Sequence, residues 1–242
     1  MKQVWHDLLF AHWPIPVAAM RAAVPRTLEL DTFEGVAWLG IVPFRMSGVR
    51  PRFLPPVPRL SAFPELNVRT YVTLGGKPGV HFFSLEARNP LAVAIARAWF
   101  HLPYFRARME CEAEGVGIRY SSVRTHAGAP EAELAGTYRP IGEAFLARPG
   151  TLERWLTELY CLYAQLPDGR VSRSEIHHAP WPLQPAEASF ERNTMARAHG
   201  FELPQTPPLL HFARRQDVVV WNPQRVTSAA ASARPSSSRP AP

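Results

Sequence analysis

Lysine is nearly absent from this 242-residue sequence, because Lys2 and Lys77 are the only lysines among its 27 basic residues. Cysteine is equally scarce, with Cys111 and Cys161 as the two copies. Two cysteines so far apart cannot form a paired-cysteine metal site by spacing, and they favour small buried apolar residues over a disulfide. The few lysines also leave few candidates for chemistry that needs a nucleophilic amine.

Long hydrophobic runs are missing as well. The sequence has no stretch of eighteen apolar residues, and residues 1–7 lack the anatomy of a signal peptide. Hydrophobic residues make up 46% of the chain and charged residues 19%, which is typical of a globular protein able to bury a core. We therefore expect a cytoplasmic protein without a membrane partner.

Motifs for metals, phosphates and nucleic acids are also lacking. The formal net charge is +7, but the arginines are scattered singly or in short pairs and form no basic helix or RNA-binding motif. The nine histidines include no H-x-x-x-H pair, and the glycine-rich segment 75–79 lacks the P-loop pattern. We expect no metal, no other cofactor and no nucleic-acid partner.

What the sequence does contain is a series of short apolar segments separated by glycine and proline. Strands are expected at 1–12, 36–46, 65–74, 80–87, 104–114, 116–125, 132–140, 170–178, 209–213 and 217–221. Helices are expected at 16–24, from Pro90 with Asn89 as its cap, from Thr151 to 163, and at 185–199. This order predicts an α+β fold, mainly antiparallel β, with helices packed on a sheet or barrel. We expect one domain over residues 1–226, a proline-rich loop at 50–64 and a disordered tail at 227–242.

Segment 63–72 carries the strongest indication of function. On a strand, alternation places Glu65, Asn67, Arg69 and Tyr71 on one face. A carboxylate, an amide, a guanidinium and a phenol in one row suit a pocket for a polar organic ligand. Arg69 is the main candidate for binding an anion because its planar fork matches a carboxylate. The alternatives are a solvated sheet face and a structural ion pair of Arg69 with Glu65 or with another acidic residue of the barrel.

Five sequence blocks occur together in a characteristic order. They are F-A-H-W-P at 10–14, N-V-R-T-Y-V at 67–72, P-G-V-H-F-F-S-L at 78–85, L-P-Y at 102–104 and I-H-H-A-P-W-P-L at 176–183. These blocks resemble the DUF2071, or YqjF-like, family over about residues 3–222. That family is similar in fold to acetoacetate decarboxylase, so the resemblance implies a closed or conical β-barrel with an internal pocket and two or three peripheral helices.

The resemblance also raises a chemical question. Acetoacetate decarboxylase forms a Schiff base through a lysine whose pKa a neighbouring lysine lowers. The resemblance places that lysine pair after a proline at a helix-to-strand junction, which corresponds here to Pro103. Tyr104 and Phe105 then occupy the two lysine positions, and neither can form an imine. Tyr104 is instead a candidate acid or hydrogen-bond donor, with an aromatic filler as the alternative.

The adjacent residues His177 and His178 must face opposite ways on a strand, so they cannot chelate one metal ion together. One of them is expected to face the pocket. His177 is our candidate for moving a proton, beside Glu65 and Tyr104. The alternative is a core histidine with its hydrogen bonds satisfied.

The sequence thus predicts a small-molecule-binding barrel without the Schiff-base lysine, its ligand held by Arg69, Asn67 and Tyr71. Acting as an enzyme, it would be a lysine-independent lyase, isomerase or hydrolase on a small carbonyl or carboxylate compound, with Tyr104, Glu65 and His177 as catalytic residues. One alternative is a non-catalytic ligand sensor or stress-related binding protein. Another is a structural module or one that forms homo-oligomers.

Overall fold

The computed structural model of the chain describes residues 1–50, 55 and 61–226. In that part it has fourteen strands, three α-helices and one 3-10 helix. In chain order they are β1 (Lys2–Ile15), α1 (Val17–Ala23), β2 (Glu29–Leu30), β3 (Ala37–Arg50), β4 (Phe63–Leu74), β5 (Lys77–Ala87), α2 (Pro90–Phe100), β6 (Tyr104–Glu114), β7 (Gly117–Arg124), β8 (Glu133–Pro140), β9 (Phe145–Leu146), α3 (Leu152–Thr157), β10 (Cys161–Gln165), β11 (Val171–His177), β12 (Pro182–Asn193), η1 (Arg197–His199), β13 (Leu209–Val220) and β14 (Gln224–Val226). Most of the expected proline-rich loop and the whole expected tail lie outside the described residues.

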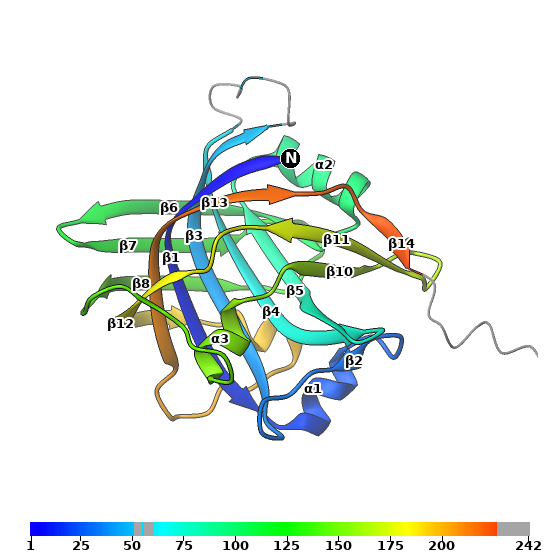
Figure 1. Ribbon diagram of the computed structural model, residues 1–242. Helices are drawn as coiled ribbons and strands as arrows, with labels where there is room; N and C mark the ends of the chain where they lie inside the picture. The colour runs from blue at the N-terminus through cyan, green and yellow to red at the C-terminus, as the bar shows by residue number, and fades with distance from the viewer. Residues whose placement is uncertain (51–54, 56–60, 227–242) are drawn as a thin grey trace, which may run out of the picture.

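The strands pair into one mixed sheet that closes on itself twice (Figure 1). A larger circuit runs β5-β6-β7-β8-β12-β13-β1-β3-β4 and returns to β5. A smaller circuit runs β5-β10-β11-β13-β1-β3-β4 and also returns to β5. Strands β13, β1, β3, β4 and β5 belong to both circuits, so they form a wall shared by two enclosed spaces.

The shared wall is apolar on both faces. Alternation sends one set of side chains into a core with β6, β7 and β8, including Leu9, Ile41, Leu66, Val68, Met109 and Tyr138. The intervening side chains face the smaller circuit, including Leu8, Phe10, Val42, Phe44, Val80 and Phe82. The larger circuit is therefore filled by a core, and the smaller one remains to hold a ligand site.

Most local signals in the sequence are confirmed. The β4–β5 hairpin forms, and its turn contains Gly75 and Gly76 with φ of 60° and 75°, values that glycine adopts without a steric penalty. Helix α2 begins at Pro90 as expected. Thr151 caps α3, because its side chain accepts a hydrogen bond from the backbone N–H of Arg154.

Three expectations about elements are wrong. Segment 185–199 is mainly strand β12, because pairing with β8 and burial of Ala186, Ala188 and Phe190 outweigh its helical propensity. Helix α3 ends at Thr157, since residues 161–165 pair with β11 and with β5 instead. The two closing strands are one continuous strand, β13.

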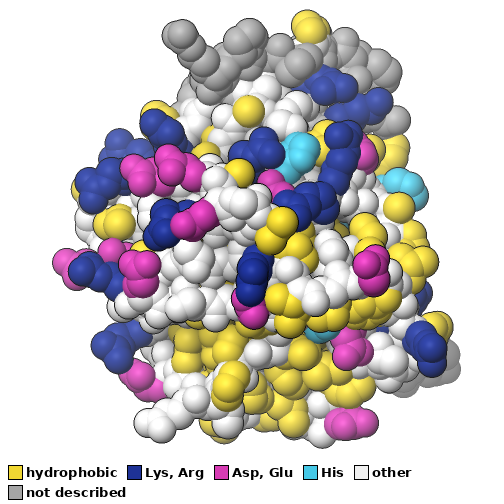
Figure 2. Space-filling view, turned by 90° about the vertical axis from the view of Figure 1, so that its left-hand side faces the viewer, with side chains coloured by type: hydrophobic (Ala, Val, Ile, Leu, Met, Phe, Trp, Pro, Cys, Tyr) yellow, Lys and Arg dark blue, Asp and Glu magenta, His cyan; other side chains and the backbone are white. Residues whose placement is uncertain are grey.

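The surface over β6, β7, β8, β12 and β13 mixes charges of both signs. Several of its arginines pair with neighbouring carboxylates, as in Arg119–Glu114 at 3.0 Å and Arg214–Asp7 at 2.9 Å. Figure 2 shows dark blue and magenta side chains interleaved on the upper part of one face and hydrophobic ones gathered lower down. No helix in the described residues is both long and apolar enough to span a membrane.

One ion pair is buried inside the larger circuit. An Arg124 guanidinium nitrogen lies 2.5 Å from a Glu86 carboxylate oxygen, and these two side chains are 1% and 0% exposed. Arg124 also donates to the Pro130 carbonyl at 3.0 Å and lies over the Phe105 ring at 4.1 Å from its centroid.

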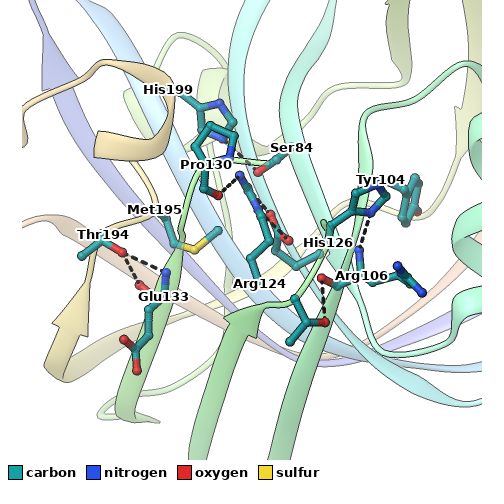
Figure 3. Close-up of polar contacts among 12 residues, drawn as sticks. Ser84, Tyr104, Arg106, Arg124, His126, Pro130, Glu133, Thr194, Met195 and His199 are labelled. Carbon is teal, nitrogen blue, oxygen red and sulfur yellow. Dashed lines mark hydrogen bonds and ion pairs between the residues drawn. The ribbon is translucent and has the colours of Figure 1, made fainter. Parts of the chain in front are cut away.

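Figure 3 shows this arginine pointing toward Pro130, with Ser84 and His199 above it. These contacts join β5, β6 and β7 next to Tyr104.

Candidate functional site

A cavity of about 350 Å³ lies inside the smaller circuit. All seven strands of that circuit contribute side chains to its lining, together with α2 and α3. Most of the lining is apolar, and its aromatic members include Trp5, Phe10, Phe44 and Trp181. An apolar cavity of this size with a few polar groups is typical of small-molecule sites.

The polar row predicted on β4 faces this cavity. Phe63, Glu65, Asn67 and Arg69 line it, whereas Leu66 and Val68 between them lie in the opposite core. Glu65 is 4% exposed and Asn67 is 5% exposed, so the alternative of a solvated sheet face is wrong. The predicted alternation along β4 is confirmed.

Glu65 forms a hydrogen-bonded pair with Tyr104. The Tyr104 hydroxyl donates to Glu65 Oε2 at 2.7 Å, and the Tyr120 hydroxyl donates to the Glu65 backbone carbonyl, also at 2.7 Å. Burial raises the pKa of Glu65 to about 8, although the bond from Tyr104 acts to lower it. The pKa of Tyr104 lies well above its ordinary value, first because of burial and then because of the nearby Glu65. At neutral pH most molecules therefore carry a protonated Glu65.

Arg69 lines the same cavity without a carboxylate partner among the described residues. Its Nη2 reaches the Leu156 carbonyl at 3.4 Å, and its buried Nε has no hydrogen-bond acceptor in the described part of the chain. The guanidinium carbon lies 5.4 Å from the centroid of the Phe10 ring. The alternative of an ion pair between Arg69 and Glu65 is therefore wrong. Buried guanidinium donors are normally satisfied, so this arrangement suits an anion supplied from outside.

Gly40 makes room for Arg69. It is the register partner of His12 on one side and of Arg69 on the other. A Cβ atom at Gly40 would lie 3.1 Å from His12 Cδ2 and 3.3 Å from Arg69 Cγ. Glycine is otherwise unfavourable inside a strand, so its presence here is explained by the close approach of these two side chains.

We expect Gly40→Ala to displace Arg69 and to weaken binding of an anion in the cavity. Alanine normally stabilises a strand relative to glycine. A decrease of about 1 kcal/mol in the free energy of unfolding would therefore show that the added methyl group is crowded by its neighbours. Urea unfolding and calorimetric titration with a carboxylate measure the two effects. Unchanged binding together with unchanged or increased stability would contradict this role of Gly40.

Tyr71 does not line the cavity, which corrects its predicted role as a direct ligand contact. It is 0% exposed and its hydroxyl lies 2.6 Å from His12 Nε2. Burial lowers the pKa of His12 well below its ordinary value, and the positive charge of Arg69 lowers it further. Tyr71 lies next to Arg69, whose guanidinium carbon is 5.9 Å from the Tyr71 ring centroid, and its hydroxyl contacts the neutral His12.

His178, rather than His177, lines the cavity. His177 is exposed, because the strand directs the two side chains to opposite sides. The prediction that His177 acts in the pocket is therefore wrong in its placement. His178 is 5% exposed, and its Nδ1 lies 2.7 Å from the Ala179 carbonyl oxygen. Burial lowers the pKa of His178.

The sequence did not identify which aromatic residues form the wall of the cavity. Trp181 stacks on Trp5 with ring centroids 6.0 Å apart, and its Nε1 has no hydrogen-bond partner among the described residues. Trp5 and Leu8 both face the cavity, although strict alternation would send residues three positions apart to opposite faces. Asp7 between them has a φ of 53°, and the register with β3 shifts between His6 and Ala11, which interrupts the alternation of β1. Only the tryptophan content hinted at such a wall.

Neither lysine lies in the cavity lining. Lys2 is exposed on β1, and Lys77 forms a salt bridge with Glu175 at 2.6 Å at the start of β5. Across residues 1–50, 55 and 61–226, no group of three His, Cys, Asp or Glu side chains is arranged to hold a metal ion.

Comparison with known proteins agrees with this architecture. The DUF2071 family model, described as "Uncharacterized conserved protein", matches residues 2–217. The uncharacterized protein YqjF of Bacillus subtilis (strain 168) is 50% identical over 221 residues, which cover 91% of this chain and 90% of YqjF.

Solved structures with the same fold are distant in sequence. Acetoacetate decarboxylase from Legionella pneumophila has a TM-score of 0.59 at 12% identity, covering 95% of this chain and 89% of that one. The enduracididine biosynthesis enzyme MppR complexed with pyruvate has a TM-score of 0.62 at 11% identity, covering 94% and 90%. At these identities the likeness establishes a shared fold, which is the acetoacetate-decarboxylase-like fold expected from the sequence.

Proposed function

Because this chain belongs to the DUF2071 family and has the fold of acetoacetate decarboxylase, we propose that its cavity binds a small organic anion and exchanges a proton with it. Arg69 binds the anionic group. Glu65, held by Tyr104, is the proton-exchanging residue. The neighbouring MppR structure, complexed with pyruvate, supports a small carboxylate as the type of ligand.

The observation that carries the proposal is the unpaired Arg69 in a mostly apolar cavity. The half-buried Arg69 guanidinium lies next to the Phe10 ring and reaches the Leu156 carbonyl. Its buried Nε has no acceptor among the described residues, and a buried donor is normally hydrogen-bonded. A carboxylate would supply two acceptor oxygens to the planar fork. Asn67, whose Oδ1 is also without a partner in the described residues, would contact the same ligand.

Glu65 supplies the acid–base chemistry in this proposal. A group with a pKa of about 8 is present in both protonation states near neutral pH, the condition under which general acid–base catalysis is most effective. The ionised carboxylate removes a proton from the carbon next to a ligand carbonyl, which leaves an enolate, and the resulting carboxylic acid returns a proton to the same carbon. Tyr104 orients the carboxyl through its bond to Oε2.

The proposal excludes a Schiff base formed by lysine. The family resemblance assigns the two lysine positions of acetoacetate decarboxylase to Tyr104 and Phe105, neither of which is an amine. Of these two residues, Tyr104 lines the cavity, whereas the Phe105 ring packs on Arg124.

The proposal predicts that small carboxylates stabilise the wild-type protein and not Arg69→Gln. The probes are pyruvate, levulinate and benzoate, with acetone and 2-pentanone as neutral comparisons. A probe at 100 times its dissociation constant adds about 2.7 kcal/mol of stability, which thermal unfolding detects readily. Losing the charged hydrogen bonds of Arg69 should weaken binding at least tenfold.

Arg108→Gln is the matched control, because it removes the same charge from an exposed position on β6. Equal binding by Arg69→Gln and Arg108→Gln would overturn the anion site. Proton exchange is tested by deuterium incorporation next to the keto carbonyl of bound levulinate and of the longer 8-oxononanoate, measured by NMR. Loss of exchange in Glu65→Gln with binding retained supports the catalytic step, and exchange at the uncatalysed rate in wild type would show binding alone.

A further inference from the structure

The polar groups of the cavity lie at two separate places along β4. Glu65 and Arg69 are four residues apart on one strand face, so their backbone positions are roughly 13 Å apart. At one end, Arg69 contacts the Leu156 carbonyl of α3. At the other end, Tyr104 bonds Glu65, and its own carbonyl accepts a hydrogen bond from Arg97 of α2 at 2.7 Å.

The cavity between these ends is bounded mainly by apolar side chains. Phe10 and Trp181 meet edge to face, with ring centroids 4.9 Å apart. Val42 of β3 and Leu85 of β5, the register partners of Asn67, line the cavity as well. Asn67, midway between Glu65 and Arg69 on β4, is the polar residue of that strand face in this middle region.

The volume limits how long a ligand can be. At about 30 Å³ for each water-sized group, 350 Å³ accommodates roughly a dozen non-hydrogen atoms. A pyruvate-sized molecule has about half as many. Its carboxylate and carbonyl carbons are bonded to each other, so a longer molecule is better suited to contact Arg69 and the Glu65–Tyr104 pair at the same time.

We infer that the ligand is an elongated amphipathic anion, with a carboxylate on Arg69, an apolar body along the aromatic wall and a hydroxyl or carbonyl oxygen at the Glu65–Tyr104 pair. This inference rests on the proposed function, because it uses the same cavity and the same anion-binding arginine. Beyond the proposed function, it specifies that the two polar groups of the ligand are far apart. That separation distinguishes the ligand from a short keto acid.

The first experiment is calorimetric titration with straight-chain carboxylates from butanoate to tetradecanoate, below their micelle-forming concentrations. Each buried methylene should tighten binding about fourfold. The increase should stop near decanoate, whose twelve non-hydrogen atoms fill the estimated volume. Decanol, without the charge, should bind wild type more weakly than decanoate and should bind Arg69→Gln as well as wild type.

Two variants test the orientation of the ligand. Leu85→Phe adds bulk next to Asn67, in the middle of the cavity, so the affinity increase should end at a shorter chain while butanoate binds as before. Tyr104→Phe should reduce the gain that a terminal hydroxyl gives an ω-hydroxy acid of eight to ten carbons, without changing binding of the unsubstituted acid. A general loss of folding would instead weaken binding of every probe equally, and circular dichroism detects it.

The outcomes separate the two proposals. Arg69-dependent binding of pyruvate or butanoate with no gain from chain length would overturn the elongated ligand and leave the anion site intact. Equal affinity of the wild-type protein for decanoate and decanol would overturn the anion site itself. Absence of binding by all carboxylates would overturn both.

Discussion

Raising the pH from 5 to 8 is expected to destabilise the wild-type protein by several kcal/mol relative to Glu65→Gln. Burial raises the pKa of Glu65 from 4.5 to about 8. Between these values the folded protein retains a proton that the unfolded chain has lost. Stability is therefore full below pH 4.5 and falls as the pH rises toward 8, by about 1.4 kcal/mol per pH unit, or about 4 to 5 kcal/mol in all.

Urea unfolding of both proteins at pH 5, 6, 7 and 8 measures this difference. Glutamine has the shape of a neutral carboxyl and does not titrate, so other ionising groups cancel in the comparison. Tyr104→Phe provides a second test. It removes a hydrogen bond that lowers the pKa of Glu65, so the loss of stability should extend to higher pH. Parallel stability curves for wild type and Glu65→Gln would show that Glu65 ionises in the folded protein at its ordinary pKa.

Replacing Glu86 with glutamine is expected to cost about 3 to 5 kcal/mol, because it leaves the Arg124 charge buried without its partner. For a chain of this size, 1 kcal/mol corresponds to about 2–4 °C, so the melting temperature should fall by roughly 10 °C. Arg124→Met should have an effect of similar size, because it leaves the Glu86 carboxylate unpaired. Differential scanning calorimetry measures both variants.

The double variant Glu86→Leu with Arg124→Met is the informative control. It removes both charges and keeps apolar volume, so much of the lost stability should return. Arg139→Met, in the exposed pair with Glu187, should leave the melting temperature nearly unchanged. Glu86→Gln and Arg124→Met could instead lower the melting temperature as little as Arg139→Met does. That result would mean that water reaches the Glu86–Arg124 pair.

Features that depend on short-range periodicity could be predicted from the sequence. The period of two along 63–72 correctly placed Glu65, Asn67 and Arg69 together, and glycines 75 and 76 located the hairpin. The start of α2 followed from Asn89 and Pro90. These signals are local, so no knowledge of the partner strands was required.

Features that depend on distant partners could not be predicted in this way. Segment 185–199 has the composition of a helix, and only pairing with β8 makes it a strand. The register shift at Asp7 changes which residues of β1 face the cavity, and no motif marks it. The choice between His177 and His178 likewise depends on which side of β11 the smaller circuit closes, which is a property of the whole sheet.

Because β4 belongs to the wall shared by the two circuits, its register with β3 decides which of its side chains face the cavity and which face the core. If β4 paired with β3 one residue out of alignment, Leu66 and Val68 would enter the cavity, and Glu65 and Arg69 would enter the hydrophobic core. Such an error would be heavily penalised, because it would bury two ionisable groups among Met109, Tyr120 and Tyr138. The polar residues that line the cavity thus also disfavour the misaligned register of β4. A variant that replaced them with apolar residues would lose both the ligand site and this bias toward the correct strand pairing.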